Sequence, residues 1–179
     1  MRKISVDELA GIAELANGSI EKIYLHWTAG PYGIPFRDYH INIDDDGVIY
    51  LMTEDLTELK AHTWHRNTGA IGISMCCCEG ALANSGYDAE FGEYPPTKVQ
   101  LETLAKVVAV LCKALDLPVN VETVMTHQEA ATEDDYGPFS GDPETRWDLW
   151  YLPDFDGAMK PGGDVIRGKA LWYLDQDEV

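Results

Sequence analysis

"IYLHWTAG", residues 23–30, is an apolar run that ends abruptly in a histidine, a tryptophan and a turn containing glycine. Its β-branched and aromatic residues, and the glycine that bounds it, predict a buried strand over residues 20–27. A single histidine at the end of such a strand is ordinarily a core residue that bonds to a backbone carbonyl. His26 would act as a metal ligand only if distant parts of the chain brought further ligand groups to it.

The segments that follow alternate between strand and helix patterns. Residues 38–52, DYHINIDDDGVIYLM, predict two strands around a tight turn, because Asp46-Gly47 is a common hairpin signal. Residues 70–78, AIGISMCCC, predict a further buried strand. Residues 98–117 predict an amphipathic helix. Its apolar face consists of Leu101, Leu104, Val107, Val108, Leu111 and Leu115.

The two ends of the chain and the segment before residue 127 complete the set of expected elements. The N-terminal residues follow a helical spacing with apolar positions at Ile4, Leu9, Ile12, Ala13 and Leu15. Residues 119–127, VNVETVMTH, predict a short strand that ends in His127, and residues 132–145 predict an acidic loop. Residues 161–173 predict a short helix or strand.

This order of elements predicts an α/β (α+β) fold with a single mixed central β-sheet flanked by helices. The chain has 179 residues and shows neither an internal repeat nor a low-complexity linker, so we expect a single domain over residues 1–179. A hydrophobic content of 45% with 25% charged residues is typical of a globular chain with one buried core.

The net charge of the chain disfavours some classes of binding partner. The formal net charge is −18, and the resulting field would repel the phosphates of nucleic acids and anionic membrane surfaces. No segment has the length of a membrane-spanning helix or the uninterrupted apolar core of a secretory signal. We therefore expect a monomer made in the cytoplasm, with no nucleic-acid partner and no insertion into membranes.

Two motifs that resemble metal sites have simpler explanations. The contiguous cysteines Cys76, Cys77 and Cys78 lack the two-residue gap of zinc motifs, so we expect them to pack as small apolar residues. Residues 42–49 imitate the start of a calcium loop, but the twelfth position is Thr53 where a bidentate glutamate is required. A hairpin is the better interpretation of that segment.

Two histidines end apolar strands, and this pattern suggests one site. His26 and His127 are both followed by small or polar loop residues, and strand ends that align at one edge of a sheet are a common place for a site. Two imidazoles and one carboxylate would bind zinc and leave its fourth position open, which is the catalytic arrangement. The acidic loop after His127 offers carboxylates, but their spacing alone does not select one.

Five segments then occur in one order along the chain. They are LHWTAG (25–30), DYHINIDDDGVIY (38–50), AHTWHRNTGAIGISM (61–75), VMTHQEAA (124–131) and RWDLW (146–150). In these segments the chain resembles the zinc-dependent N-acetylmuramoyl-L-alanine amidases (amidase type 2), the family of phage T7 lysozyme and the peptidoglycan recognition proteins. The resemblance implies the fold of that family, a Zn²⁺ cofactor, and hydrolysis of the amide bond between N-acetylmuramic acid and L-alanine in peptidoglycan.

The resemblance also implies a set of metal-site residues. His26 and His127 match the two histidine ligands, and Asp148 matches the third ligand, which in the family lies two residues after a lysine. Here Arg146 takes the place of that lysine, so it could stabilise an oxyanion but could not act as an acid. Tyr39 matches the tyrosine that stands beside the metal-bound water. The alternative third ligand is Asp142 in SGDPE, which has a serine in the position of the cation.

Further positions match the substrate groove of the family. Asn67 and the strand after it correspond to the block that shapes the groove, with His62 close by, and Trp27 and Trp64 are candidates for stacking on sugars. The proton for the leaving amine could come from water, from His62 or from Glu129, and the sequence does not choose among them. Two other histidines have expected places: His40 in a structural role, and His65 in the groove or behind the ligands.

Two other functions compete with the amidase interpretation. One is a non-catalytic peptidoglycan-binding module of the same fold, which a complete His, His, Asp set argues against. The other is a zinc hydrolase of the deaminase type, suggested by HQE at residues 127–129, but its Pro-Cys-x-x-Cys partner is missing. A bacteriolytic enzyme must reach the cell wall in the periplasm. We expect either a phage endolysin released through a membrane hole or an injected antimicrobial effector, which would require an immunity protein.

Overall fold

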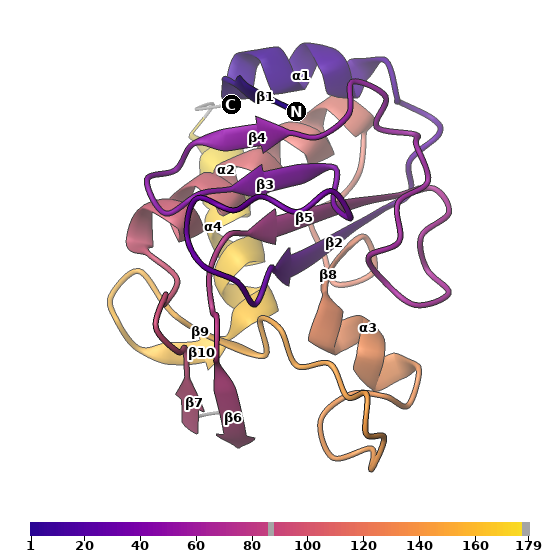
Figure 1. The fold of residues 1–179 in the computed structure, drawn as a ribbon. Helices are drawn as coiled ribbons and strands as arrows, with labels where there is room; N and C mark the ends of the chain where they lie inside the picture. The colour runs from indigo at the N-terminus through magenta and orange to yellow at the C-terminus, as the bar shows by residue number, and fades with distance from the viewer. Residues whose placement is uncertain (86–87, 177–179) are drawn as a thin grey trace.

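A mixed β-sheet of six strands runs through the centre of the computed structural model, which describes residues 1–85 and 88–176 (Figure 1). The strand order is β1-β4-β3-β5-β2-β8. The bounds of these strands are β1 Arg2–Ile4, β2 Lys22–Trp27, β3 Ile41–Ile43, β4 Ile49–Leu51, β5 Ala70–Met75 and β8 Val124–Thr126. The helices are α1 Val6–Glu14, α2 Lys98–Leu115, α3 His127–Glu133 and α4 Gly162–Asp175. The expected fold, a mixed central sheet flanked by helices, is confirmed.

The middle of the sheet is parallel and one side of it is antiparallel. Strand β2 pairs in parallel with both β5 and β8, and β3 pairs in parallel with β5. Strands β3 and β4 form the predicted hairpin, with Ile43 opposite Ile49. In its turn, Gly47 has a φ of +83°, a conformation that glycine adopts without steric cost. The Asp44 carboxylate accepts a hydrogen bond from the Gly33 amide (2.7 Å), so this acidic segment is a turn that holds a neighbouring loop.

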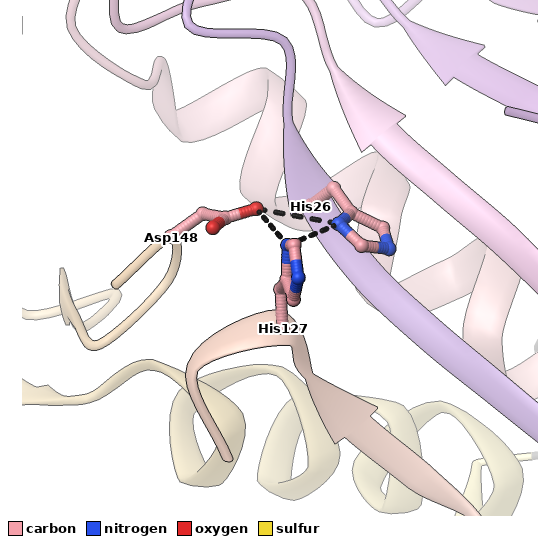
Figure 2. A group of neighbouring side chains, drawn as sticks. All are labelled: His26, His127 and Asp148. Atoms are coloured by element: carbon pink, nitrogen blue, oxygen red, sulfur yellow. Dashed lines mark hydrogen bonds and ion pairs between the residues drawn. The ribbon is translucent and has the colours of Figure 1, made fainter. Parts of the chain in front are cut away.

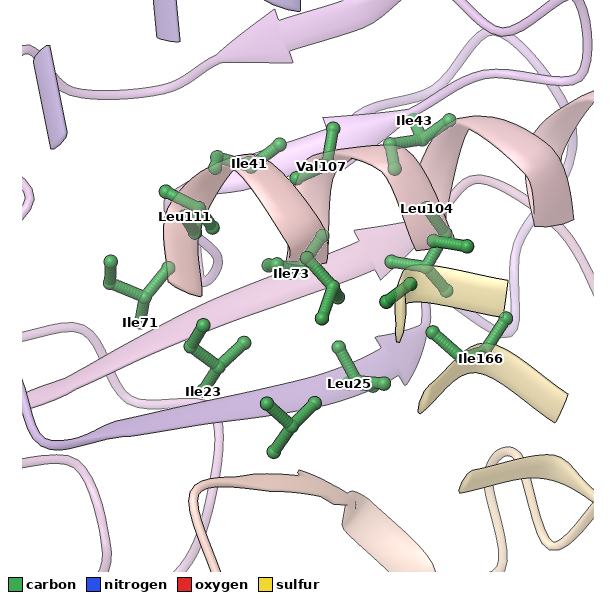
Figure 3. Packing of buried hydrophobic residues seen from close by; sticks show 14 of the residues in the cluster. Ile23, Leu25, Ile41, Ile43, Ile71, Ile73, Leu104, Val107, Leu111 and Ile166 are labelled. Atoms are coloured by element: carbon green, nitrogen blue, oxygen red, sulfur yellow. The ribbon is translucent and has the colours of Figure 1, made fainter. Parts of the chain in front are cut away.

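Helices α2 and α4 cover one face of the sheet, where they pack against each other (Figures 1 and 3). Helix α2 begins at a capping box between Thr97 and Gln100 and ends at Asp116, which adopts a left-handed conformation. All six positions of its predicted apolar face are buried, which confirms that prediction. Opposite them lie the isoleucines and the leucine that the parallel strands direct toward the helices: Ile23, Leu25, Ile41, Ile43, Ile71 and Ile73.

The other face of the sheet carries the polar side chains. Side chains alternate along a strand, so Tyr24 and His26 of β2 point away from the face that Ile23 and Leu25 occupy. The register places Tyr24 beside Gly72 and His26 beside Ser74 of β5. The alternation along β2 therefore puts the histidine of the opening motif on the face that α2 and α4 do not cover.

The N-terminus departs from the predicted helix. Residues Arg2–Ile4 form β1 at the edge of the sheet, and α1 begins only after Ser5, whose side chain and Glu8 make a capping box. Ile4 is therefore a strand residue. Leu15 follows the end of α1 and is 86% exposed, so it is not part of the buried face.

Some small elements lie outside the pattern-based prediction. The short helix α3 starts at His127. Two further antiparallel pairs are β6 (Leu82–Ser85) with β7 (Asp88–Glu90) and β9 (Tyr151–Pro153) with β10 (Met159–Pro161). The C-terminal segment is a helix, α4, which resolves the choice between helix and strand. The expected packing of the cysteine run is confirmed, because Cys76, Cys77 and Cys78 are all buried. Within the described ranges, no helix combines the length and apolarity that a membrane span requires.

Candidate active site

His26 and His127 lie side by side because of the register of two parallel strands. Strand β2 pairs with β8 so that Leu25 lies opposite Thr126, and the residue that follows each of them is a histidine. The two rings are 4.7 Å apart between centroids, and their Nδ1 atoms are 3.1 Å apart. Thr126 caps helix α3 through Glu129, which fixes the backbone where His127 begins the helix.

Asp148 completes the group from a loop more than a hundred residues after His26 (Figure 2). Its Oδ2 atom lies 3.3 Å from His26 Nδ1 and 3.2 Å from His127 Nδ1. The residues on either side of it are anchored in the protein: the Trp147 ring packs against Trp27 (5.2 Å between centroids), and Leu149 is fully buried. Leu149 also has a φ of +57°, so the chain turns sharply here and presents the carboxylate to the two imidazoles.

The three side chains fit a zinc ion. A tetrahedral zinc ion with bonds of about 2.0–2.1 Å places its ligand atoms roughly 3.3–3.4 Å apart. The separations of the three converging atoms here are 3.1, 3.2 and 3.3 Å. Two imidazole nitrogens and a carboxylate oxygen that meet at one point, all on buried residues, form a donor set suited to zinc, with a fourth position left for a non-protein ligand.

The charges of this group suit a cation. Burial lowers the pKa of His26 to about 4, so its ring is neutral at pH 7, as a metal ligand must be. Burial alone would raise the pKa of Asp148, but the interactions with His127 and His26 outweigh it and hold that pKa well below its ordinary value. The cluster therefore presents one negative charge between two imidazoles.

The alternative carboxylate, Asp142, is not part of this cluster. It is exposed, and its Oδ1 atom accepts a hydrogen bond from the Glu144 amide (2.7 Å) while its own amide donates to Ser140 Oγ (3.1 Å). Asp142 therefore shapes its own loop. Among the residues that the structure describes, Asp148 is the carboxylate that meets both histidines.

Tyr39 and Arg146 border the same hollow, beside the three converging side chains. The Tyr39 ring lies 5.0 Å from the His26 ring, and burial raises its pKa well above the ordinary value, so the phenol keeps its proton. Arg146 is exposed, and its Nη1 atom donates a hydrogen bond to the Glu144 carbonyl (2.5 Å). A neutral hydroxyl and a guanidinium thus stand at the edge of the group, as donors rather than as bases.

A groove of about 550 Å³ opens beside His127. Its aromatic wall is made by Trp64, which is 59% exposed, and by Tyr136, whose ring lies 5.5 Å from it in perpendicular orientation. The lining residues are Ala61, His62, Thr63, Trp64, His65, Asn67, His127, Tyr136, Asp142, Glu144 and Arg146. Sequence reasoning missed Tyr136. The available signal was a lone tyrosine in the acidic run EDDYG.

Trp27 and Asn67 lie close to the groove but serve mainly the structure around it. Trp27 is 6% exposed and packs against Phe91 and Trp147, which leaves little surface for a sugar. The Asn67 Oδ1 atom accepts hydrogen bonds from the backbone amides of His62 (3.1 Å) and Thr63 (2.8 Å). Asn67 therefore fixes the loop that carries these two residues.

Glu129 is engaged elsewhere, so it has no place in proton delivery. Its two oxygens each accept a hydrogen bond of 2.8 Å from Arg167, and one of them also accepts from the Thr126 amide. Arg167 donates in addition to the Val124 carbonyl (2.9 Å). The ion pair with Glu129 ties α4 to α3, and the bond to Val124 ties α4 to β8, so Arg167 supports the junction of β8 and α3 at which His127 lies.

Two further histidines lie nearby, because the His62 ring is 5.3 Å from that of His26 and the His40 ring is 5.7 Å from that of His62. His40 has the expected structural role, because its Nδ1 atom accepts a hydrogen bond from the Gly72 amide (3.0 Å) and its Nε2 atom donates to the Glu58 carbonyl (2.8 Å). Burial, followed by the nearby histidines, lowers the pKa of His62 to about 2. A ring this hard to protonate does not supply the proton for a leaving amine at neutral pH.

These lowered pKa values predict an acid-sensitive metal-free protein. His26 and His62 stay neutral in the folded state, while in the unfolded chain both take up protons below about pH 6.5. Their contribution is therefore fully present above that pH, and it is lost as the pH falls toward the folded values. We expect the free energy of unfolding to fall by roughly 2–3 kcal/mol from these two groups between roughly pH 7 and pH 5.5.

Urea unfolding of chelator-treated protein at several pH values measures this loss. His62→Gln is the matched control, because it removes one of the two groups and should remove about half of the pH-dependent loss. A pH dependence that is the same with and without His62 would contradict the assignment.

The sequence also matches a known protein family. A family model described as N-acetylmuramoyl-L-alanine amidase matches residues 16–138, more than half of the chain. The chain belongs to this family. The match includes His26, Tyr39, His62 and His127, and it ends before Asp148. In this N-acetylmuramoyl-L-alanine amidase family member, the matched region does not reach Asp148, which the structure brings to the two histidines.

Two solved structures illustrate the likeness of this amidase-family chain. The endolysin N-acetylmuramoyl-L-alanine amidase LysCS from Clostridium intestinale is 18% identical, with a TM-score of 0.44 over 63% of this chain and 71% of that one. PGRP-Hd from Alvinella pompejana is 19% identical, with a TM-score of 0.39 over 69% of this chain and 81% of that one. A comparison with curated proteins gives no match.

Proposed function

We propose that this chain is a zinc-dependent amidase that hydrolyses the bond between N-acetylmuramic acid and L-alanine in peptidoglycan. The observation that carries the proposal is the buried group of His26, His127 and Asp148 beside an open groove, in a member of the N-acetylmuramoyl-L-alanine amidase family. A non-catalytic binding module would have no use for two imidazoles and a carboxylate spaced for a metal.

The residues of the site have distinct roles in this reaction. His26, His127 and Asp148 would hold the zinc ion. When bound, zinc supplies Lewis-acid polarisation of the amide carbonyl and makes water a nucleophile at neutral pH. The three protein ligands are buried and anchored, so they keep one side of the site dry and rigid.

Tyr39 and Arg146 would stabilise the negative charge that develops on the carbonyl oxygen. The neutral Tyr39 hydroxyl can donate a hydrogen bond, and Arg146 contributes a permanent positive charge at the rim of the site. The exposed Trp64 ring, backed by the largely buried Tyr136, offers a surface on which an apolar sugar or peptide face can pack.

We place the action of the enzyme at the bacterial cell wall, because that is where peptidoglycan lies. A phage endolysin and an antimicrobial effector are two settings that would bring such an enzyme to the periplasm, and an effector would call for an immunity protein. A lytic role in either setting follows from cleavage of the bond that joins peptide to glycan.

The products of digestion test the proposed reaction. Purified peptidoglycan treated with the zinc-loaded protein should release peptides with a free N-terminal L-alanine, detected by mass spectrometry, and leave glycan strands without new reducing ends. His26→Ala provides the inactive control. New reducing ends without free L-alanine would indicate a glycosidase, and binding without release would indicate a recognition module; either would contradict the proposal.

A further inference from the structure

The His62 ring packs against a position on β5 that is occupied by glycine. It is 8% exposed and lies flat against β5 at Gly72, where a Cβ atom would come within 2.6 Å of its ring. Its neighbours on that face are the rings of Tyr24, His26 and His40, at centroid distances of 6.0, 5.3 and 5.7 Å. Because a side chain at position 72 would clash with the ring, the position of the His62 ring depends on the glycine at position 72.

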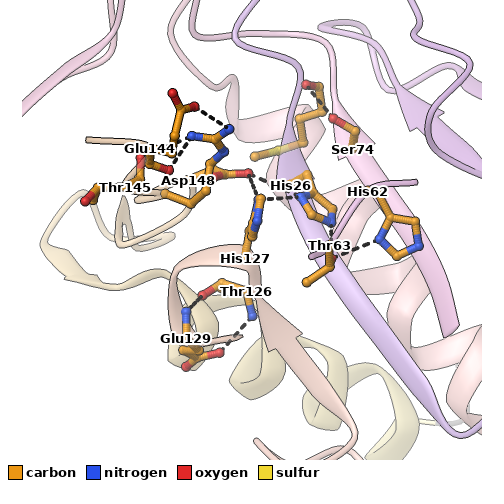
Figure 4. A network of polar contacts seen from close by, with 12 residues as sticks. His26, His62, Thr63, Ser74, Thr126, His127, Glu129, Glu144, Thr145 and Asp148 are labelled. Atoms are coloured by element: carbon orange, nitrogen blue, oxygen red, sulfur yellow. Dashed lines mark hydrogen bonds and ion pairs between the residues drawn. The ribbon is translucent and has the colours of Figure 1, made fainter. Parts of the chain in front are cut away.

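A short hydrogen-bonded chain joins His62 to the ligand His26 (Figure 4). The Nδ1 atom of His62 lies 3.0 Å from the hydroxyl of Thr63, and that hydroxyl lies 3.3 Å from the Nε2 atom of His26. Thr63 is buried, so solvent does not compete for its hydroxyl. Among the described residues, the Nε2 atom of His62 has no hydrogen-bond partner.

Once His26 binds a metal, the positions of the protons in this series of hydrogen bonds are fixed. His26 directs Nδ1 toward Asp148 and His127, and a coordinating nitrogen carries no proton, so its proton lies on Nε2. That Nε2–H donates to Thr63 Oγ1, and the hydroxyl in turn donates its own proton to Nδ1 of His62. The opposite order would give His26 Nε2 an accepted bond and place a proton on Nδ1, where it would block the metal.

We propose that Thr63 and His62 are positioning residues that hold His26 in the tautomer and orientation in which Nδ1 binds the metal. This inference rests on the proposed function, because it takes His26 to be a zinc ligand. The loop that carries both residues is held in place, because the Asn67 side chain binds their backbone amides and so fixes where the hydroxyl and the imidazole lie. Groups that orient a ligating imidazole are commonly worth about 10–100-fold in metal affinity.

Thr63→Val tests the role of the hydroxyl, since it keeps the size and branching of the side chain and removes only the hydrogen-bonding group. We expect its affinity for Zn²⁺, measured on metal-depleted protein by competition with a chromophoric chelator, to be about 10–100-fold weaker than that of the wild type. Thr63→Ser retains the hydroxyl and should bind Zn²⁺ within roughly threefold of the wild type. Equal affinities for the valine and wild-type proteins would overturn the proposal.

A second measurement needs no variant and so does not depend on how Thr63→Val folds. In zinc-loaded protein with ¹⁵N-labelled histidine, the NMR spectrum should show both His26 and His62 as Nε2–H tautomers, with Nδ1 of His26 bound to the metal. A proton on Nδ1 of His62, or coordination through Nε2 of His26, would contradict the proposed order of protons.

These readouts separate the inference from the proposed reaction. Tight zinc binding with the expected tautomers, in a protein that leaves peptidoglycan intact, would contradict the amidase function and support the positioning role. Efficient cleavage by a Thr63→Val protein with unchanged zinc affinity would do the reverse. A wild-type protein without measurable zinc affinity would overturn both.

Discussion

Asp148→Asn is expected to lower the rate of peptidoglycan hydrolysis by about three orders of magnitude or more, because a metal-bound reaction loses several kcal/mol of transition-state stabilisation without its ion. The substitution keeps the shape of the side chain but removes the negative charge that meets both histidines. Neutral asparagine is a weaker zinc ligand, and its amide nitrogen would face the imidazoles. We therefore expect the zinc content per chain to fall together with the activity.

Asp142→Asn is the matched control, since it makes the same chemical change at the other carboxylate that the sequence offers. Asp142 is exposed and bonded within its own loop, so this protein should keep its zinc and lose activity by no more than a few-fold. Circular dichroism should show both proteins folded. Loss of zinc and activity in Asp142→Asn, with Asp148→Asn unaffected, would show that the wrong carboxylate was assigned.

Removal of zinc should abolish activity, and addition of zinc should restore it. Treatment with a chelator followed by dialysis should reduce hydrolysis to the background of His26→Ala. Stoichiometric Zn²⁺ should bring it back, whereas Ca²⁺ and Mg²⁺ should not, because these ions favour sites made of oxygen ligands and the cluster provides two nitrogens.

The same addition should stabilise the fold. Zinc that binds only the folded state contributes about 4 kcal/mol at a free concentration a thousand times its dissociation constant. For a chain of this size, that corresponds to a rise in Tm of roughly 10 °C. Asp148→Asn should show little of this zinc-dependent rise. Full activity in protein whose metal content is far below one ion per chain would contradict a zinc-dependent reaction.

Much of the fold follows from local pattern, and so do two of the three proposed ligands. The apolar run of β2 and the amphipathic spacing of α2 are strong signals because tertiary packing uses the faces that the sequence marks. The two histidines were predictable as a pair because each lies near the end of an apolar, strand-like run. Their contact additionally requires that β2 and β8 be neighbours in the sheet, which the sequence indicates only through the general habit of strand ends to share an edge.

The local sequence pattern does not identify the third proposed ligand, Asp148. The chain has 31 acidic residues, so charge and spacing favour none of them. Asp148 reaches the histidines because Trp147 packs on Trp27 and Leu149 enters the core, and both contacts are long-range. Family resemblance, through the cation two residues earlier, separated Asp148 from Asp142 where the residues by themselves did not.

Other roles depended on partners far away in the sequence. Glu129 was a plausible proton donor on sequence grounds, but Arg167 of α4 holds its carboxylate. The edge strand β1 escaped prediction because Ser5 starts the helix one residue after Ile4, and a three-residue strand gives too short a pattern to detect. Thr63 gave no sequence signal beyond its place next to His62. Its proposed role depends on the contact of its hydroxyl with Nε2 of His26, a residue far away in the sequence.

The proposed reaction requires that His26, His127 and Asp148 bind one zinc ion together. Anomalous X-ray diffraction at the zinc absorption edge, on crystals of the zinc-loaded protein, tests it most directly. We expect a single strong peak in the site, within about 2.0–2.2 Å of the two Nδ1 atoms and of one Asp148 oxygen. A peak elsewhere, for example at the buried cysteines, with the two imidazoles and the carboxylate left without an ion, would contradict it.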